Sequence, residues 1–158
     1  MNGTRYVVLA RPHPFIAEHM KKFLSEQGYT PLPIQQITEL EGLAAQGTVV
    51  GAVISTSLTS VSGESYVDDF RHLRDKYPDM RVMFATLGNP KDMLRPIARA
   101  ISSDSLDANV LEVKAANQYD PSIGAKDTFL LVHKDCVAKP EAIRMTAAMV
   151  GRHFGTKD

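Results

Sequence analysis

Several short apolar runs in this sequence end in polar or cationic side chains that suit the binding of an anion. These side chains are Arg11, His13, Ser55, Thr56, Thr86 and Lys134. If the runs are neighbouring parallel strands, their carboxyl ends meet at one edge of the sheet, where open α/β sheets bind ligands. Guanidinium, ammonium, imidazole and hydroxyl groups gathered there would surround a small anion with hydrogen-bond donors. The sequence therefore predicts a candidate anion site at the strand ends.

The same residues do not fit the common catalytic or cofactor patterns. Ser55 is not on a Gly-x-Ser-x-Gly elbow, which disfavours a Ser-His-Asp hydrolase. Neither a Gly-x-Gly-x-x-Gly loop nor a Walker-type loop is present, so a nucleotide cofactor is not expected. The single cysteine, Cys136, has no partner for an internal disulfide, and no His/Cys cluster has zinc spacing. We therefore predict that the protein is not an enzyme and has no catalytic residue, cofactor or metal site.

The overall composition is typical of soluble globular proteins. Hydrophobic residues make up 44% and charged residues 23% of the 158 residues, which predicts one folded domain over residues 1–158. Lysine plus arginine equals aspartate plus glutamate at 18 each, so no net field attracts nucleic acid or an anionic membrane. No apolar run approaches the length of a membrane span, and the N-terminus lacks a signal-peptide pattern. These features predict a cytoplasmic protein.

Apolar runs alternate with segments of helical periodicity along the chain. The predicted strands cover residues 6–10, 31–35, 49–54, 81–86 and 129–132. The predicted helices begin near Pro14, Thr38, Val67, Pro90 and Pro140. Runs that are apolar throughout are typical of strands buried on both faces, and parallel neighbours need crossover connections. The alternation therefore predicts an α/β fold with a doubly wound, five-stranded parallel sheet.

Local charge patterns give further expectations for two of the helices. Thr38 and Glu41 have the spacing of a capping box, in which each side chain bonds the backbone N–H of the other residue. In the third helix, Asp68 and Asp69 lie beside Arg71 and Arg74. Mixed charge of this kind is usual on a solvated helix face, so both carboxylates are expected to be exposed.

Residues 102–127 do not fit the alternation of strands and helices. The segment is longer than a usual helix-to-strand loop of about 2–6 residues. It contains an apolar patch at Val110, Leu111 and Val113. Burial against the sheet edge or against a partner would remove these side chains from water. We therefore predict an insertion between the fourth helix and the fifth strand, with an extra edge strand as one way of ordering it.

This order of elements resembles the receiver domain of two-component response regulators over nearly the whole chain. The resemblance begins at Arg11-Pro12-His13-Pro14, after the first strand, and continues at Gly28-Tyr29, after the first helix. In receivers the third, fourth and fifth strands end on a phosphoacceptor aspartate, on a serine or threonine, and on a lysine. The matching positions here are Ser55 or Thr56, then Thr86, then Lys134. The resemblance implies a receiver/flavodoxin-like fold that retains the family's hydroxyl and ammonium groups.

The sequence departs from receivers at the positions that carry out phosphoryl transfer. Arg11 and Pro12 stand where the family has the acidic pair that holds Mg²⁺, and neither residue offers a carboxylate oxygen. Ser55 or Thr56 replaces the acceptor aspartate with a hydroxyl, which is a poor nucleophile without a base or metal beside it. Asp135 follows the lysine, where receivers usually have proline. The resemblance is therefore to a degenerate receiver, or pseudo-receiver, without a metal site or aspartyl phosphorylation.

Degenerate receivers typically act as interaction modules, so the resemblance implies docking on a signalling or localisation protein without phosphorylation. In receivers the fourth and fifth helices commonly mediate dimerisation and output contacts, so the resemblance also suggests a homodimer. The insertion lies beside that face, and Val110, Leu111 and Val113 are the predicted contacts. One alternative is a small-anion or metabolite sensor that uses the strand-end pocket. Another is that Arg11 and the hydroxyls only fill the space that metal and phosphate occupy in receivers.

Overall fold

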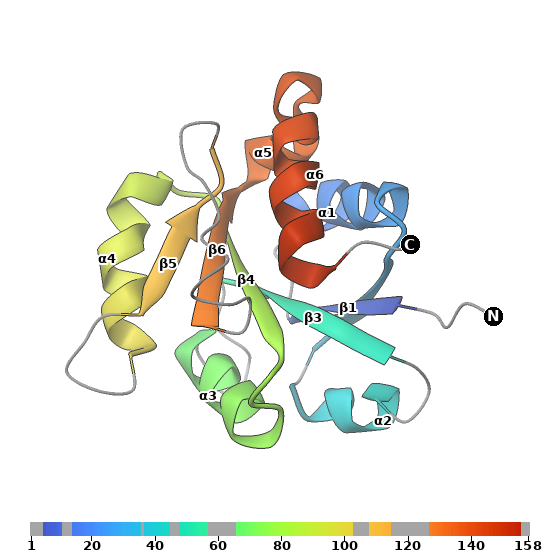
Figure 1. Cartoon of the computed structure of the whole chain (residues 1–158), viewed down its shortest axis with the longest axis vertical. Helices are drawn as coiled ribbons and strands as arrows, with labels where there is room; N and C mark the ends of the chain where they lie inside the picture. The colour runs from blue at the N-terminus through green and yellow to red at the C-terminus, as the bar shows by residue number, and fades with distance from the viewer. Residues whose placement is uncertain are drawn as a thin grey trace.

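The computed structural model describes residues 5–10, 14–35, 37–44, 48–56, 66–102, 108–114 and 127–155. Its strands are β1 (Arg5–Ala10), β2 (Thr30–Ile34), β3 (Thr48–Ser55), β4 (Arg81–Thr86), β5 (Asn109–Glu112) and β6 (Thr128–His133). Its helices are α1 (Pro14–Glu26), the short 3-10 helix η1 (Ile37–Glu39), α2 (Leu40–Ala44), α3 (Tyr66–Lys76), α4 (Pro90–Ala100), α5 (Lys134–Ala138) and α6 (Pro140–Phe154) (Figure 1). Among the described helices, none has both the length and the apolar character that crossing a membrane requires.

The strands form a parallel sheet in the order β2-β1-β3-β4-β6-β5. The expected sheet had five strands, whereas the described sheet has six. The additional strand is β5, which pairs with β6 at one edge of the sheet and places Val110 level with Phe129. This strand lies within the insertion 102–127, where burial at the sheet edge removes apolar side chains from water. The predicted α/β, doubly wound fold is confirmed, with this correction to the strand count.

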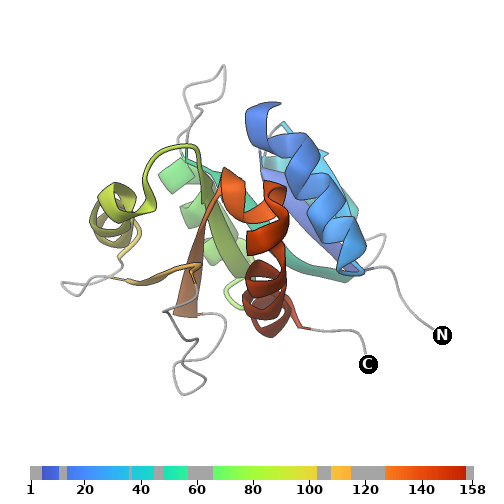
Figure 2. The same cartoon turned by 90° about the horizontal axis from the view of Figure 1, so that it is seen from above.

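Alternate residues of the central strands point to opposite faces of the sheet, and helices cover each face. On β1, Val7 and Leu9 belong to the core shared with α1 and α6, whereas Val8 and Ala10 belong to the core shared with α3 and α4. Both views show α1 beside α5 and α6, with α3 and α4 away from them (Figures 1 and 2). The sheet is therefore buried on both faces, which explains why its strands are apolar throughout.

The predicted capping box of Thr38 and Glu41 is wrong. The helical segment already begins before Thr38, as η1. Glu39 takes the part expected of Glu41, because its carboxylate accepts a hydrogen bond from Gln35 N at 2.9 Å. Glu41 instead forms an ion pair with Lys76 of α3. Because η1 begins at Ile37, Thr38 lies inside the helical segment and is not its N-cap.

The expectation of two exposed carboxylates on α3 is also wrong. Asp68 is exposed, but Asp69 is only 1% exposed. Successive helix residues point in directions about 100° apart, since a turn has about 3.6 residues. Asp69 therefore turns toward the core side of the helix, which also carries Phe70 and Leu73. A local charge pattern did not reveal which of the two carboxylates is buried.

Candidate functional site

Neighbouring strands end together at the carboxyl edge of the sheet, where the sequence predicts the candidate site. β3 ends at Ser55, β4 ends at Thr86, and β6 ends at His133, directly before Lys134. These strands are adjacent, and Thr86 is level with His133 in the register of β4 and β6. The structure thus brings Ser55, Thr86 and Lys134 to neighbouring strand ends, as the strand pattern predicts.

The hydroxyl residues at this edge are largely buried and take part in backbone contacts. Ser55 is 6% exposed and Thr86 is 2% exposed. Thr86 Oγ1 accepts a hydrogen bond from Gly88 N at 3.1 Å, which shapes the turn after β4. Thr56 N donates to Ala85 O at 3.0 Å, which extends the pairing of β3 with β4 beyond Ser55. Thr56 and Thr86 therefore contribute to the structure of the strand ends themselves.

The other predicted members of the site are cationic or titratable. Arg11 and His13 lie outside the described residues. Lys134 is partly buried at the start of α5, and within the described ranges its ammonium group makes no hydrogen bond or ion pair. The described residues contain no cis peptide bond, so the bond between Lys134 and Asp135 is trans. Lys134 therefore places at the strand ends a positive charge that no described carboxylate neutralises.

His133, the last residue of β6, is a polar member of this edge that sequence reasoning missed. Its Nδ1 accepts a hydrogen bond from Asp135 N at 3.1 Å and so caps α5. An unprotonated Nδ1 leaves the proton on Nε2, which lies 3.3 Å from Leu87 O. Both ring nitrogens are therefore already engaged. No local pattern could have found this cap, because its donor is the backbone N–H of residue 135 and the bond depends on where β6 ends.

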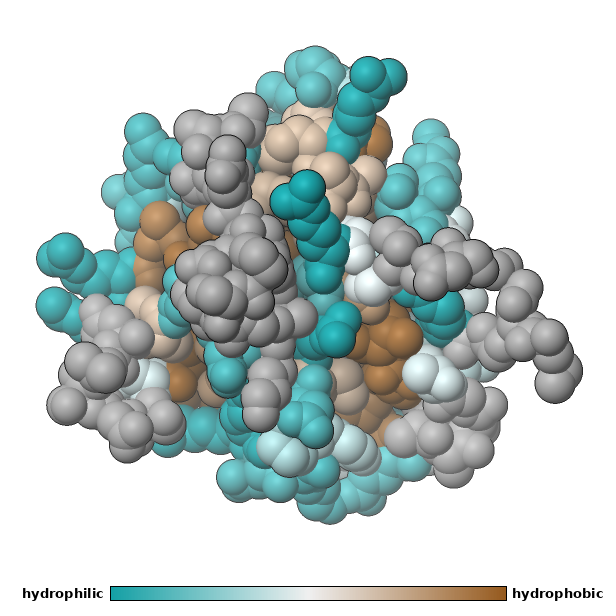
Figure 3. All heavy atoms as spheres, viewed as in Figure 1, coloured by the Kyte–Doolittle hydropathy of each residue, from teal (hydrophilic) through white to brown (hydrophobic). Residues whose placement is uncertain are grey.

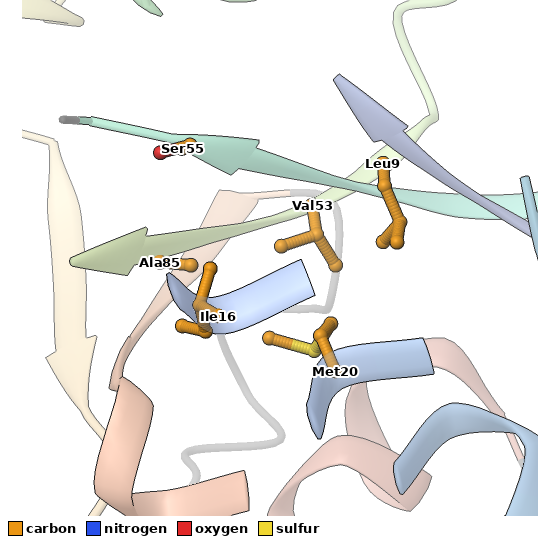
Figure 4. Close-up of a pocket in the computed structure, with 6 residues that line it drawn as sticks. All are labelled: Leu9, Ile16, Met20, Val53, Ser55 and Ala85. Atoms are coloured by element: carbon orange, nitrogen blue, oxygen red, sulfur yellow. The ribbon is translucent and has the colours of Figure 1, made fainter. Parts of the chain in front are cut away.

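The cavity next to Ser55 is small and mostly apolar (Figure 4). It is lined by Leu9, Ile16, Met20, Val53, Ser55 and Ala85. Leu9 and Val53 point from the sheet toward the α1 side chains Ile16 and Met20. The cavity volume is about 10 Å³, which is roughly the minimum for one water molecule. This cavity therefore has no room for a phosphate or a metabolite.

Carboxylates that could hold a metal ion are not assembled in the described part of the site. β3 ends at Ser55, so the end of this strand has a hydroxyl where the resemblance calls for an aspartate. Asp135, just after β6, lies 3.5 Å from Lys139 Nζ and 3.6 Å from His133 Nδ1. Across the described ranges, no three His, Cys, Asp or Glu side chains are grouped so as to bind a metal ion. The described strand ends offer hydroxyl, imidazole and ammonium groups.

The opposite, amino edge of the sheet holds a denser polar cluster that sequence reasoning also missed. The Arg5 guanidinium of β1 donates to Gly155 O and lies 4.7 Å from the centre of the Tyr29 ring. Tyr29 Oη donates to the same carbonyl at 2.5 Å. Arg81 of β4 donates to His153 O at 3.1 Å. These residues, called the amino-edge cluster below, fasten the end of α6 to the sheet by satisfying its last carbonyl groups.

Burial changes the titration of two members of the amino-edge cluster. His153 is 0% exposed, and its Nε2 lies 2.8 Å from Val82 O. Burial lowers the pKa of His153 to about 4; the hydrogen bond to Val82 O opposes this shift, and the Arg81 cation adds to it. Burial also raises the pKa of Tyr29, and the Arg5 cation opposes that shift. At neutral pH His153 is therefore neutral and donates its Nε2 proton to Val82 O.

The apolar side chains of β5, predicted to contact a partner, pack within the chain. Val113, just after the strand, is 2% exposed, and its N donates to Leu131 O at 2.9 Å. Leu111 packs against the core shared with α1 and α6, and Val110 packs against the core on the other face. Val113 thus has no exposed surface for a partner, which corrects its place in the predicted contact set. A docking role for the partly buried Val110 and Leu111 stays a prediction.

Solved structures of response regulators share this arrangement of strands and helices. A response regulator receiver domain protein from Clostridium thermocellum matches with a TM-score of 0.56 and 13% identity, over 96% of this chain and 94% of that chain. This chain has a receiver-like fold. The non-phosphorylated receiver domain of the stress response regulator RcsB from Escherichia coli matches with a TM-score of 0.56 and 11% identity, over 98% and 99% of the two chains.

The comparisons establish the fold and say nothing about the chemistry of the site residues. The RcsB response regulator of Salmonella typhimurium matches with a TM-score of 0.56 and 14% identity, and this chain spans 62% of that chain's length. No protein-family model matches the sequence, and no curated protein matches it. Identities this low show a shared fold alone. The predicted resemblance to receivers is thus confirmed at the level of the receiver-like fold.

Proposed function

We propose that this chain is a pseudo-receiver, a signalling module that acts through protein–protein contacts and independently of aspartyl phosphorylation. The observation that carries the proposal is the end of β3, where Ser55 and Thr56 supply hydroxyls in a receiver-like fold. A receiver needs a carboxylate nucleophile at that strand end. The partner is a signalling or localisation protein, and self-association into a homodimer is a second form of the same activity.

The surroundings of the β3 end support the proposal. A serine or threonine hydroxyl becomes a nucleophile when a neighbouring base takes its proton. In the described part of this edge the base of suitable type is His133, but its Nδ1 accepts from Asp135 N and its Nε2 faces Leu87 O. Ser55 itself is 6% exposed, beside a cavity lined mainly by apolar side chains. Attack of this hydroxyl on a phosphoryl donor is therefore not expected.

The alternative of a small-anion or metabolite sensor has weaker support. Lys134 retains a positive charge at the strand ends, which favours an anion. The cavity beside Ser55, however, has room for about one water molecule, and a phosphate is several times larger. Arg11 and His13 belong to this alternative and lie outside the described residues. In the experiment below, a shift in melting temperature with beryllium fluoride but without an added phosphoryl group would favour the sensor.

The experiment exposes the protein to acetyl phosphate with Mg²⁺ and measures its intact mass. It also measures the melting temperature with and without beryllium fluoride, a mimic of a phosphorylated aspartate. We expect no added phosphoryl group and no shift in melting temperature. A phosphoryl group that disappears in the Ser55→Ala, Thr56→Ala double variant would overturn the proposal by showing an active hydroxyl. A phosphoryl group that survives in this variant would overturn it by showing an acidic acceptor elsewhere.

A further inference from the structure

Helix α4 presents a row of cations on its outer face. Lys91, Arg95 and Arg99 are spaced four residues apart, and all three side chains are exposed. Residues four apart lie on the same face of a helix, separated by about 6 Å along its axis. These residues are called the α4 ridge. In the space-filling view, hydrophilic side chains project outward at the left edge, where α4 lies (Figure 3).

Within the described ranges the α4 ridge has no acidic partner; Lys22 and Lys134 also lack one there, but the ridge brings three such cations together on one helix face. Several lysines on other elements form ion pairs within the chain. These pairs are Lys21 with Glu18, Lys76 with Glu41, Lys114 with Glu112, and Lys139 with Asp135. Within the described ranges, none of the three ridge cations forms an ion pair or a side-chain hydrogen bond. The ridge charges are therefore exposed, and no acidic side chain in the described part of the chain neutralises them.

The α4 ridge also lowers the stability of the helix that carries it. Lys91 lies in the first turn, where the positive end of the helix dipole repels a cation. Lys91 and Arg95, and then Arg95 and Arg99, are like-charged pairs at a spacing that destabilises a helix. Asp92 in the first turn and Arg99 in the last turn suit the dipole and offset part of this effect. No contact within the described chain explains why three cations share this face.

The charge of the whole chain helps to decide which class of anionic partner could bind the α4 ridge. Lysine plus arginine and aspartate plus glutamate are equal at 18 each, so the attraction is local to the ridge. Surfaces that bind anionic lipid usually cluster about 4–8 cations, and nucleic-acid-binding domains are usually basic overall. The ridge has three cations beside Asp92, which matches a short acidic segment better than an extended polyanion.

We propose that the α4 ridge docks an acidic helical segment of a partner protein, whose carboxylates at every fourth position face Lys91, Arg95 and Arg99. The spacing of such carboxylates, about 6 Å along their own helix, equals that of the ridge cations. This inference rests on the proposed role as an interaction module and names the class of partner. The main contribution of the charges is to steer and orient the acidic segment.

The test uses an alanine-based helical peptide with glutamate at every fourth position over three turns, and measures binding by fluorescence anisotropy. We expect binding that weakens as salt increases, and a loss of about tenfold or more in affinity for the Lys91→Glu, Arg95→Glu, Arg99→Glu variant. The matched control is Lys22→Glu, Arg144→Glu, Arg152→Glu, which changes the net charge equally at exposed positions outside α4. This control should bind like the unmodified protein.

A stability measurement separates lost docking from lost folding. The single variant Lys91→Glu should bind the peptide more weakly yet melt at a slightly higher temperature, because glutamate suits the first helical turn and can pair with Arg95. Equal weakening by the two triple variants would overturn the proposal, since net charge would then explain binding. Tighter binding to duplex DNA, or to vesicles of phosphatidylserine and phosphatidylcholine, would also overturn it. Phosphoryl uptake from acetyl phosphate would defeat the proposed function without affecting this result.

Discussion

The two ends of the sheet differ in how their polar residues are used. At the carboxyl edge, Lys134 has no partner in the described ranges, and Thr86 bonds the turn that follows it. At the amino edge, Arg5 and Arg81 donate to the last carbonyls of α6, and Tyr29 donates beside Arg5. The comparison teaches that the residues diagnostic of receivers are separate from the residues that hold the last helix in place.

The physical basis of the difference is the direction of the helix ends. α6 points its C-terminus, the negative end of its dipole, at the amino edge of the sheet. The guanidinium groups of Arg5 and Arg81 satisfy carbonyls that lack a helical partner and interact favourably with this dipole. We therefore expect substitutions in the amino-edge cluster to change stability more than substitutions at the strand-end site.

The largest loss of stability is expected at acidic pH, from protonation of His153 at the amino edge. Its pKa is about 4 in the folded chain, against an ordinary value of 6.5, so the unfolded chain binds a proton first as the pH falls. Neutral His153 should make its full contribution to the free energy of unfolding above pH 6.5. This free energy should fall by about 3 kcal/mol between pH 6.5 and 4. Urea denaturation of the protein and of His153→Gln across this range measures the loss. A variant with the same pH dependence as the unmodified protein would contradict the assignment.

The next largest effect is expected from Gly51→Ala in β3. A Cβ at this position would overlap the Phe154 ring and lie 3.0 Å from Arg81 O, so the end of α6 would have to move. Overpacking of this kind should lower the free energy of unfolding by about 1–3 kcal/mol. The control is Gly42→Ala, because a Cβ at residue 42 meets nothing within 4 Å. Equal free energies of unfolding for the two variants in urea would show that Phe154 of α6 is not in close contact with Gly51 of β3.

Arg5→Met should have a smaller effect on the same edge. Methionine keeps much of the length of the side chain that lies over Tyr29 but removes the donor to Gly155 O. Because Tyr29 Oη still donates to that carbonyl, we expect a loss of about 1–2 kcal/mol in the free energy of unfolding. Chemical denaturation measures it. A double variant with Tyr29→Phe should lose more than the two single variants together, since the carbonyl then has neither donor.

Lys134→Met at the carboxyl edge should have the smallest effect. The ammonium group has no partner in the described part of the chain, so its removal should change the free energy of unfolding by no more than about 0.5 kcal/mol. The same denaturation experiment checks this value. A loss as large as that of Arg5→Met would erase the contrast between the two edges and would point to a structural role for this lysine.

Local patterns were enough to predict most of the elements and part of the site. Strands buried on both faces must be apolar throughout, and helices need an apolar stripe, so the alternation could be read directly along the chain. Parallel strands then bring their carboxyl ends to one edge, which is why Ser55, Thr86 and Lys134 could be placed together. His133 was missed at that edge because its cap on α5 depends on where β6 ends.

The sequence by itself thus determined the receiver-like order of elements and the hydroxyl and ammonium groups at the strand ends. Tertiary structure alone decided that β5 pairs with β6, that Asp69 is buried, and that Arg5 bonds Gly155. Periodicity and caps act over a few residues, so one sequence contains their signal. The Arg5 to Gly155 contact joins residues 150 positions apart, and such a partner is fixed only when the sheet and α6 have packed.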